Sequence, residues 1–336
     1  MTKPIDIADV RARLAAPILG RAQPDPFDLT VHHRHPRIAT IRFAPGRPIG
    51  YALSASYPDW TDRSFLAQRL AGMRLFFGAL RDIEPGLDGT CDLWLGDVPE
   101  APGLAFSGCA SSNVLVPDPD FVASDGYRQL RREAEGMLPW PERENDLFWR
   151  GTLSGDPKRR APGWRTLQRA RLCLAGRASV VGVPLDAKLV GDPRNAAGSE
   201  GWVEIGDLGL LADRVALHDF ARYRHAIDID GNSCAWMGLF TKLLMGCTVV
   251  KVDSPLGHRQ WYYDRLVPWI DFVPVSADLG DLDAVRTWLA REPEAARAIA
   301  ARGRALACAI TFDQALLDVA PRVIAHIRAA KAQPCA

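Results

Sequence analysis

The stretch YRHAIDIDGNSCAWMGLFTKLLMGCTVVKVDSPLGHRQWYYDRLVPWIDFVPV, residues 223–275, decides the fold of this chain. It alternates apolar, β-prone runs with helical ones. We expect a strand at 222–231, a helix at 236–246, a strand at 247–252, a short helix at 260–269 and a strand at 270–275. Apolar strands that alternate with helices at this spacing are typical of βαβ units, whose parallel sheet is covered by helices on both faces. The stretch therefore predicts a doubly wound α/β domain.

The alternation of strands and helices continues on both sides of this stretch. Upstream we expect a strand at 145–151, a helix at 163–176 and a strand at 179–185; downstream, helices at 282–306 and 312–330 are interrupted by Pro293 and Pro321. Residues 118–144, rich in proline, charge and tryptophan, separate this part from the N-terminal half. We place the domain boundary near the end of that segment. The prediction is a C-terminal domain over 146–336, whose last helix could pack back on the first domain.

Residues 1–145 read as a smaller α/β domain. RIATIRFAPGRPIGYAL, residues 37–53, has two β-prone runs around a Pro-Gly turn and predicts a hairpin. A helix follows at 61–80, where apolar residues recur at helical spacing. CDLWLGDVPE, residues 91–100, predicts a strand that ends in a loop containing Asp97. Two such domains would enclose a cleft.

Composition limits the function classes. At 336 residues the chain has room for about two domains. Its 41 lysines and arginines against 40 acidic residues leave a net charge of +1, which disfavours nucleic acid as a main partner. Seven scattered cysteines without a CxxC pair argue against a disulfide framework or a zinc site. With no signal-peptide pattern and no apolar run of spanning length, we expect a soluble, cytoplasmic protein.

Ligands of an open parallel sheet bind beyond the carboxyl ends of its strands, and one such end here is DIDGNS. A Gly-Asn-Ser turn directly before a helix start favours a phosphate. On this segment alone, a plain β–turn–α connection with Ser233 as helix cap is the favoured interpretation. Asp228 and Asp230 also match the DxD pattern of metal–diphosphate sites, which is short and arises often by chance. Neither a P-loop nor GxGxxG is present.

Two other strand ends could carry chemistry. In FWRGTLSGDPKRR, residues 148–160, Arg150 is followed by a small-residue loop and by Lys158, Arg159 and Arg160. Such a loop is suited to bind a diphosphate. The sequence is equally compatible with a solvated basic loop in which Arg150 forms a structural ion pair. Asp97 could serve as a general base for an acceptor hydroxyl. A role as a loop residue before Val98-Pro99 is more common for a lone aspartate.

Three blocks in the same order, DLWLGDVP, FWRGTLSG and residues 223–282, resemble glycosyltransferase family 90. This family includes the Rumi-like protein O-glucosyltransferases, the capsule-associated proteins and bacterial lipopolysaccharide-modifying enzymes. The third block contains a WYYDRLxPW segment and a VPVxxDLxDL segment of the kind found in the family. The resemblance covers roughly residues 92–282 and points to a bacterial-type member.

The resemblance implies a GT-B fold, in which two Rossmann-like domains face a central cleft and the C-terminal one binds most of the nucleotide-sugar. It also implies an inverting, metal-independent transfer from a UDP-sugar, without a cofactor. Asp97 then matches the family's base, and the donor-binding positions are Arg150, Gly151, Thr152, Arg159, Asp230, Gly231, Asn232 and Lys242. Many relatives carry an arginine where this chain has Gly238-Leu239. Either Lys242 or another cation neutralises the diphosphate here, or donor binding is arranged differently.

The resemblance and the expected compartment together suggest the acceptor. We expect a glycan or lipid-linked glycan, such as lipopolysaccharide or another surface polysaccharide, glycosylated at the inner face of the cell membrane with a peripheral membrane contact. Two alternatives stay open. One is a metal-dependent transferase, in which Asp228 and Asp230 hold Mn²⁺ or Mg²⁺ against the diphosphate. The other is a non-catalytic nucleotide- or carbohydrate-binding protein on a transferase fold.

Overall fold

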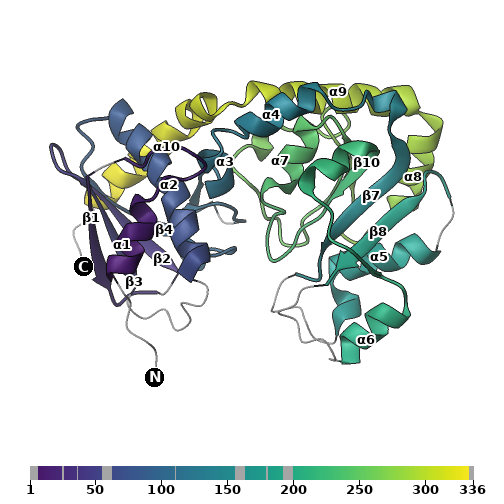
Figure 1. The fold of residues 1–336 in the computed structure, drawn as a ribbon, viewed down its shortest axis with the longest axis horizontal. Coiled ribbons are helices and arrows are strands. Elements are labelled where there is room, and N and C mark those ends of the chain that lie inside the picture. Colours follow the sequence, from purple (N-terminus) through teal and green to yellow (C-terminus); the bar gives the residue numbers. More distant parts are fainter. Residues whose placement is uncertain are drawn as a thin grey trace. The chain divides into compact units, whose positions relative to one another are not determined.

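The computed structural model describes residues 7–24, 26–35, 37–54, 63–109, 111–155, 163–178, 181–191 and 200–332. The chain divides into two compact units, one of residues 1–128 with 310–336 and the other of residues 129–309. In the described residues, each unit contains one six-stranded sheet (Figure 1). The α/β class predicted from the sequence is confirmed for both units. None of the described helices combines the length and the apolar character that a membrane span requires.

The unit of residues 129–309 is built on a parallel sheet. Its strands are β7 (Glu144–Thr152), β8 (Leu185–Val190), β9 (Leu211–Ala212), β10 (Tyr223–Asp228), β11 (Thr248–Val252) and β12 (Val273–Val275). They lie in the order β12-β11-β10-β7-β8-β9, and every pair is parallel. Counted within the unit this order is 3-2-1-4-5-6, the doubly wound arrangement that the sequence predicted. The strand order reverses between β7 and β10, and ligands bind beside that reversal in folds of this kind.

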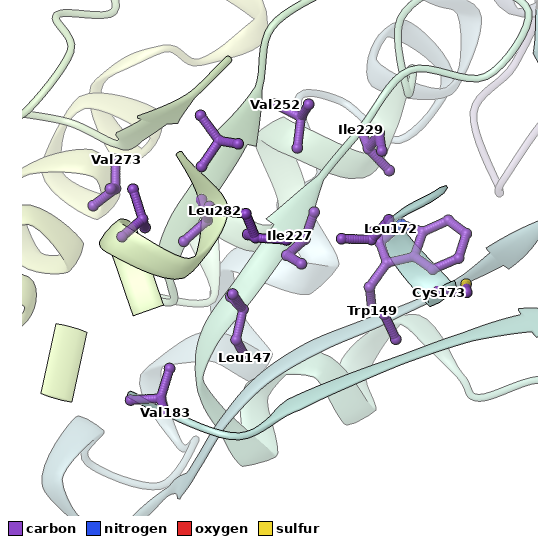
Figure 2. Close-up of a cluster of buried hydrophobic side chains, with 14 of the residues drawn as sticks. Leu147, Trp149, Leu172, Cys173, Val183, Ile227, Ile229, Val252, Val273 and Leu282 are labelled. Carbon is purple, nitrogen blue, oxygen red and sulfur yellow. The ribbon is translucent and has the colours of Figure 1, made fainter. Parts of the chain in front are cut away.

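Six of the described helices belong to this unit or begin at its edge. They are α4 (Arg128–Glu135), α5 (Gln168–Ala178), α6 (Glu200–Asp207), α7 (Met237–Leu244), α8 (Leu282–Arg291) and α9 (Pro293–Ala309). Residues of α5, α6, α8 and α9 complete the core of the sheet. Figure 2 shows Leu147 and Ile227 of adjacent central strands packed with Leu172 of α5 and Leu282 of α8. All five residues of β11 are buried, as expected for a strand inside a parallel sheet. This packing fixes the carboxyl ends of β7, β10 and β11 relative to the start of α5.

The other unit contains a mixed sheet. Its strands are β1 (Phe27–His32), β2 (Ile38–Phe43), β3 (Ile49–Ser54), β4 (Gly89–Trp94), β5 (Gly103–Ala105) and β6 (Asn113–Leu115), in the order β1-β3-β2-β4-β5-β6. The predicted hairpin is confirmed as β2 and β3. Because β2 runs antiparallel to both of its neighbours, the sheet departs from the all-parallel form of a Rossmann-like domain. The helices of this unit are α1 (Ile7–Ala15), α2 (Arg63–Ile83), α3 (Pro119–Ala123) and α10 (Phe312–Ala332), and α10 packs on β4 and α2.

Three predicted elements differ from the structure. The helix expected at 260–269 is only a 3₁₀ turn at 263–265, because Trp261, Tyr262 and Tyr263 are all buried and three consecutive side chains cannot share one helix face. Of the strand expected at 179–185, residues 179 and 180 lie outside the described residues, and β8 begins only at Leu185, after Gly182 with its positive φ of 64°. Pro321 does not interrupt α10. Because proline has no amide hydrogen, the carbonyl of Leu317, four residues earlier, lacks its helical hydrogen-bond donor. Both Pro321 and Leu317 are exposed, so water can donate to that carbonyl instead.

Candidate functional site

A pocket lies where the strand order of the doubly wound sheet reverses. Its volume is about 100 Å³ among the described residues. The lining comes from the segments that follow β7, β10 and β11, from the start of α5 and from the segment after β12: Ser154, Gly155, Thr166, Leu167, Gln168, Arg171, Asp230, Gly231, Asn232, Pro255, Leu256, His258 and Ala277. The structure therefore brings Asp230, Gly231 and Asn232 to one pocket with Ser154 and Gly155, which follow β7.

The start of α5 gives this pocket hydrogen-bond donors. The amide of Arg171 donates to the carbonyl of Leu167, so the amides just before it in the first turn have no partner within the helix. Leu167 and Gln168 both line the pocket. The Gln168 side chain holds the helix start in place, because its Nε2 donates to the carbonyls of Asp253 at 3.0 Å and Ala277 at 2.8 Å. The first-turn amides and the positive end of the helix dipole make this edge suitable for a phosphate.

Arg169 joins the two central strand ends, and sequence reasoning did not single it out. Its Nη1 donates to Ser154 Oγ at 2.7 Å and to the carbonyl of Thr152 at 3.1 Å, beyond β7 and at its end. Its Nε donates to the carbonyl of Asp230 at 2.8 Å, and its Nη2 to that of Ile229 at 3.2 Å, just after β10. The signal was available, since an arginine in the first turn of the helix after β7 faces the ligand edge of a doubly wound sheet.

Gly231 is required by this arrangement. A Cβ at this position would lie 2.8 Å from Ser154 Oγ and 2.9 Å from Arg169 Nη2. Both distances are too short for a side-chain carbon, so an alanine would displace one partner or the other. The glycine thus lets the turn after β10 approach the loop after β7.

Asp230 is a buried carboxylate in the pocket wall. The residue is 5% exposed, and neither carboxylate oxygen has a hydrogen-bond partner of acceptable geometry among the described residues. Burial raises the pKa of Asp230 to about 6, and the nearby Lys251 ammonium and Ser254 hydroxyl act in the opposite direction. A carboxylate kept in such a place without a partner is a common sign of a functional site.

Asp228 and Lys242 form a buried ion pair. Lys242 Nζ of α7 lies 3.2 Å from Asp228 Oδ1 at the end of β10, and the two side chains are 6% and 0% exposed. A Cβ on Gly238 would lie 3.3 Å from that Nζ, so the small residue leaves room for the lysine. Lys242 does not line the pocket described above. Among the described residues, no group of three or more His, Cys, Asp or Glu side chains could hold a metal ion.

The remaining positions of the predicted donor loop have different surroundings. Arg150 forms an ion pair with Asp186 of β8 at 2.7 Å, donates to the carbonyl of Asp186 and lies over the Phe148 ring at 4.4 Å. The Arg150 guanidinium is therefore directed toward Asp186 of the neighbouring strand β8. Arg150 is not among the described residues that line the pocket. The carbonyl of Thr152 accepts from Arg169, and Gly151 packs against the Trp149 ring. Lys158, Arg159 and Arg160 lie outside the described residues.

Asp97 belongs to the other unit, where it follows β4. Its Oδ1 accepts a hydrogen bond from Arg69 Nη2 at 2.9 Å, and its carbonyl accepts from Ser107 Oγ at 2.9 Å. Arg69 is buried and also donates to the carbonyl of Leu95, so it fixes the carboxylate against the end of the strand. The Asp97 side chain remains about one third exposed. The arrangement is a fixed, solvent-accessible carboxylate at a strand end.

Comparison with known proteins gives a family match. The model of Glycosyl transferase family 90 matches residues 123–310, more than half of the chain. Protein O-glucosyltransferase 2 of Danio rerio is 27% identical over 232 residues, which are 63% of this chain and 42% of that protein. Protein O-glucosyltransferase 3 of Homo sapiens is 31% identical over 105 residues, which are 31% of this chain and 19% of that protein. The matched stretch thus spans less than half the length of either relative.

Similarity to solved structures is weaker. The structure of Anabaena HepE in complex with UDP-glucose aligns with 60% of this chain and 53% of that chain, at 13% identity and a TM-score of 0.36. HepE in complex with UDP gives nearly the same values, with a TM-score of 0.35.

Proposed function

The chain belongs to glycosyltransferase family 90, and on that premise we propose that it transfers a sugar from a UDP-sugar to a hydroxyl group of a glycan acceptor. The observation that carries the proposal is the pocket at the reversal of strand order in residues 129–309. This pocket lies within the matched residues 123–310 and has the helix start and the close glycine turn that a nucleotide diphosphate needs.

In this proposal the donor diphosphate lies against the first turn of α5. Its negative charge is stabilised by the first-turn amides and by Arg171, which also lines the pocket. Arg169 links the ends of β7 and β10 through its hydrogen bonds, and its guanidinium adds positive charge next to Gly231. Arg159 and its basic neighbours remain proposed donor-binding residues. These amides and cations would already be in place when UDP departs, and they would stabilise the negative charge that develops on its diphosphate.

The proposed reaction is a single inverting displacement at the anomeric carbon. Asp97 is the proposed base, because its carboxylate is fixed by Arg69 and accessible to solvent. It would take the proton of the acceptor hydroxyl as the glycosidic bond forms, while the bond to UDP breaks and the electron pair leaves with the diphosphate. A glycan or lipid-linked glycan, such as lipopolysaccharide, is the proposed acceptor, and the inner membrane face is the proposed location.

Calorimetric titration of the purified protein with UDP-glucose, with and without EDTA, tests the donor part of the proposal. The expected result is micromolar binding that chelation does not change. Binding that requires a divalent cation would support the metal-dependent alternative with Asp228 and Asp230 instead. No binding of UDP-glucose, UDP-galactose or UDP would contradict a UDP-sugar donor.

A further inference from the structure

Asp230 lies in the wall of the proposed donor pocket, and no described residue donates a hydrogen bond of good geometry to either of its carboxylate oxygens. We infer that Asp230 recognises hydroxyl groups of the bound ligand and thereby selects polyhydroxylated donors. This inference rests on the proposed function, because it assumes that the pocket at the end of β10 holds the donor. It gives Asp230 a defined chemical role, namely the acceptance of hydrogen bonds from O–H groups.

The contrast with Asp228 shows that Asp230 has no charged partner among the described residues, although the nearby Ser254 hydroxyl lowers its pKa. The two aspartates are two residues apart, and both are buried. Asp228 has Lys242 at 3.2 Å, whereas no cation lies within ion-pair distance of Asp230 among the described residues. A buried carboxylate without a hydrogen bond costs stability, so its presence in a pocket wall indicates that a ligand supplies the donor.

The neighbouring cations are held by other groups. Arg169 uses its Nε, Nη1 and Nη2 on three carbonyls and on the Ser154 hydroxyl, and it contacts Asp230 only through the main-chain carbonyl. Lys251 on β11 is buried with its Nζ 4.9 Å from the centre of the Tyr263 ring. These cations favour the ionised carboxylate electrostatically, but they leave its oxygen lone pairs available.

The chemistry of the missing donor follows from the charge of the acceptor. An ionised carboxylate repels phosphate oxygens and has no proton to donate, so the complementary group must be an O–H or N–H. Hydrogen bonds from hydroxyls to an ionised acceptor are roughly twice as strong as neutral ones. A UDP-sugar offers such hydroxyls from two sources, the ribose and the transferred sugar. Either source satisfies the same acceptor, and the experiment below separates them.

The test is calorimetric titration of wild type and Asp230→Asn with UDP, 2′-deoxy-UDP and UDP-glucose. We expect the variant to bind UDP-glucose about 10- to 100-fold more weakly than wild type. If the ribose provides the donor, the variant also loses affinity for UDP. The loss is much smaller for 2′-deoxy-UDP if the donor is the 2′-hydroxyl, and it is the same for both ligands if the donor is the 3′-hydroxyl. If the transferred sugar provides it, UDP binds both proteins equally and only UDP-glucose distinguishes them.

A second readout separates recognition from a structural role. Because no cation forms an ion pair with the buried Asp230 among the described residues, Asp230→Asn should raise the melting temperature at pH 7, whereas the matched variant Asp228→Asn should lower it by breaking the ion pair with Lys242. The exposed Asp213→Asn controls for the loss of a carboxylate elsewhere in the unit, and both readouts should match those of wild type.

Failure of this inference is distinct from failure of the proposed function. If wild type binds UDP-glucose and Asp230→Asn binds it equally well or more tightly, the role given to Asp230 is wrong while the donor site stands. If Asp230→Asn melts at a lower temperature than wild type, the carboxylate has a structural partner and the inference is overturned. If wild type binds none of the three ligands, the proposed function itself is contradicted.

Discussion

At the scale of single residues, the pocket depends on one arginine with four hydrogen bonds. Arg169 Nε, Nη1 and Nη2 donate to acceptors on the segments that end β7 and β10. Arg169→Gln should lower the free energy of unfolding by about 1–3 kcal/mol, because partly buried carbonyls lose their donor. It should also weaken UDP-glucose binding, since the two strand ends are no longer held together.

Urea unfolding and calorimetry measure the two effects. Arg165→Gln is the matched control, because Arg165 precedes the same helix and forms an exposed ion pair with Glu204 at 2.6 Å. Exposed pairs of this kind contribute about 0–1 kcal/mol, so the control should change neither quantity much. An Arg169→Gln protein with the stability and affinity of wild type would show that the strand ends do not need this link.

The titration of Asp230 should be visible in stability without any ligand. Its pKa in the folded chain is about 6, above the ordinary 3.8, so the folded state binds the extra proton between about pH 4 and 6. The free energy of unfolding therefore loses a contribution as pH rises through that window, and this loss is complete above about pH 6. Asp230→Asn lacks it and should be more stable than wild type at pH 7, by up to about 3 kcal/mol.

Urea unfolding of both proteins from pH 4 to 7.5 provides the measurement. The difference between variant and wild type should be near zero at pH 4 and grow towards pH 7. A difference that is constant over this range would mean that Asp230 titrates in the folded chain as it does in the unfolded one.

At the scale of elements, the β10–α7 turn and the loop after β7 approach each other because residue 231 is a glycine. Gly231→Ala would place a methyl group within 3 Å of both Ser154 Oγ and Arg169 Nη2. The turn should move away, and affinity for UDP-glucose should fall about tenfold or more. Gly191→Ala is the control, since a Cβ there meets nothing within 4 Å. Equal calorimetric affinities for both variants would show that this close approach does not shape the pocket.

The sequence predicted the elements better than the directions of their side chains. Alternating apolar strands and helices predicted the sheet of residues 129–309, because burial on both faces leaves a strong pattern. The apolar pattern does not show whether the side chain of Arg150 or that of Arg169 lies beside the pocket. The direction of Arg150 depends on Asp186, a residue of the neighbouring strand β8 that is 36 positions away. That of Arg169 depends on carbonyls after β10. Strand pairing decides such contacts, and composition or spacing does not reveal it.

The aromatic segment before β12 is a second place where tertiary contacts, which the sequence does not reveal, decide the local structure. We expected a short helix there, but tertiary packing buries three consecutive rings, Trp261, Tyr262 and Tyr263, and leaves only a 3₁₀ turn. The pair of Asp228 and Asp230 likewise matched a metal-binding pattern. The structure distinguishes the two residues, since one has a buried lysine partner and the other faces the pocket without one.

For the molecule as a whole, we propose that residues 129–309 bind the donor and that the other unit, which contains Asp97, supplies the base. Asp97→Asn should therefore leave UDP-glucose affinity near that of wild type and reduce the rate of sugar transfer by about 10²- to 10⁴-fold. Transfer to a glycan acceptor and calorimetric titration measure the two quantities. Asp82→Asn on the surface of the same unit is the control. A parallel loss of affinity and rate in Asp97→Asn would place this residue in binding instead of proton transfer.

A crystal structure of the protein with UDP-glucose bound would show directly where the donor lies. We expect the diphosphate at the first turn of α5, beside Gly231, and hydroxyl groups within hydrogen-bond distance of the Asp230 carboxylate. A nucleotide bound anywhere else, with the edge between β7 and β10 unoccupied, would contradict the assignment of the donor site.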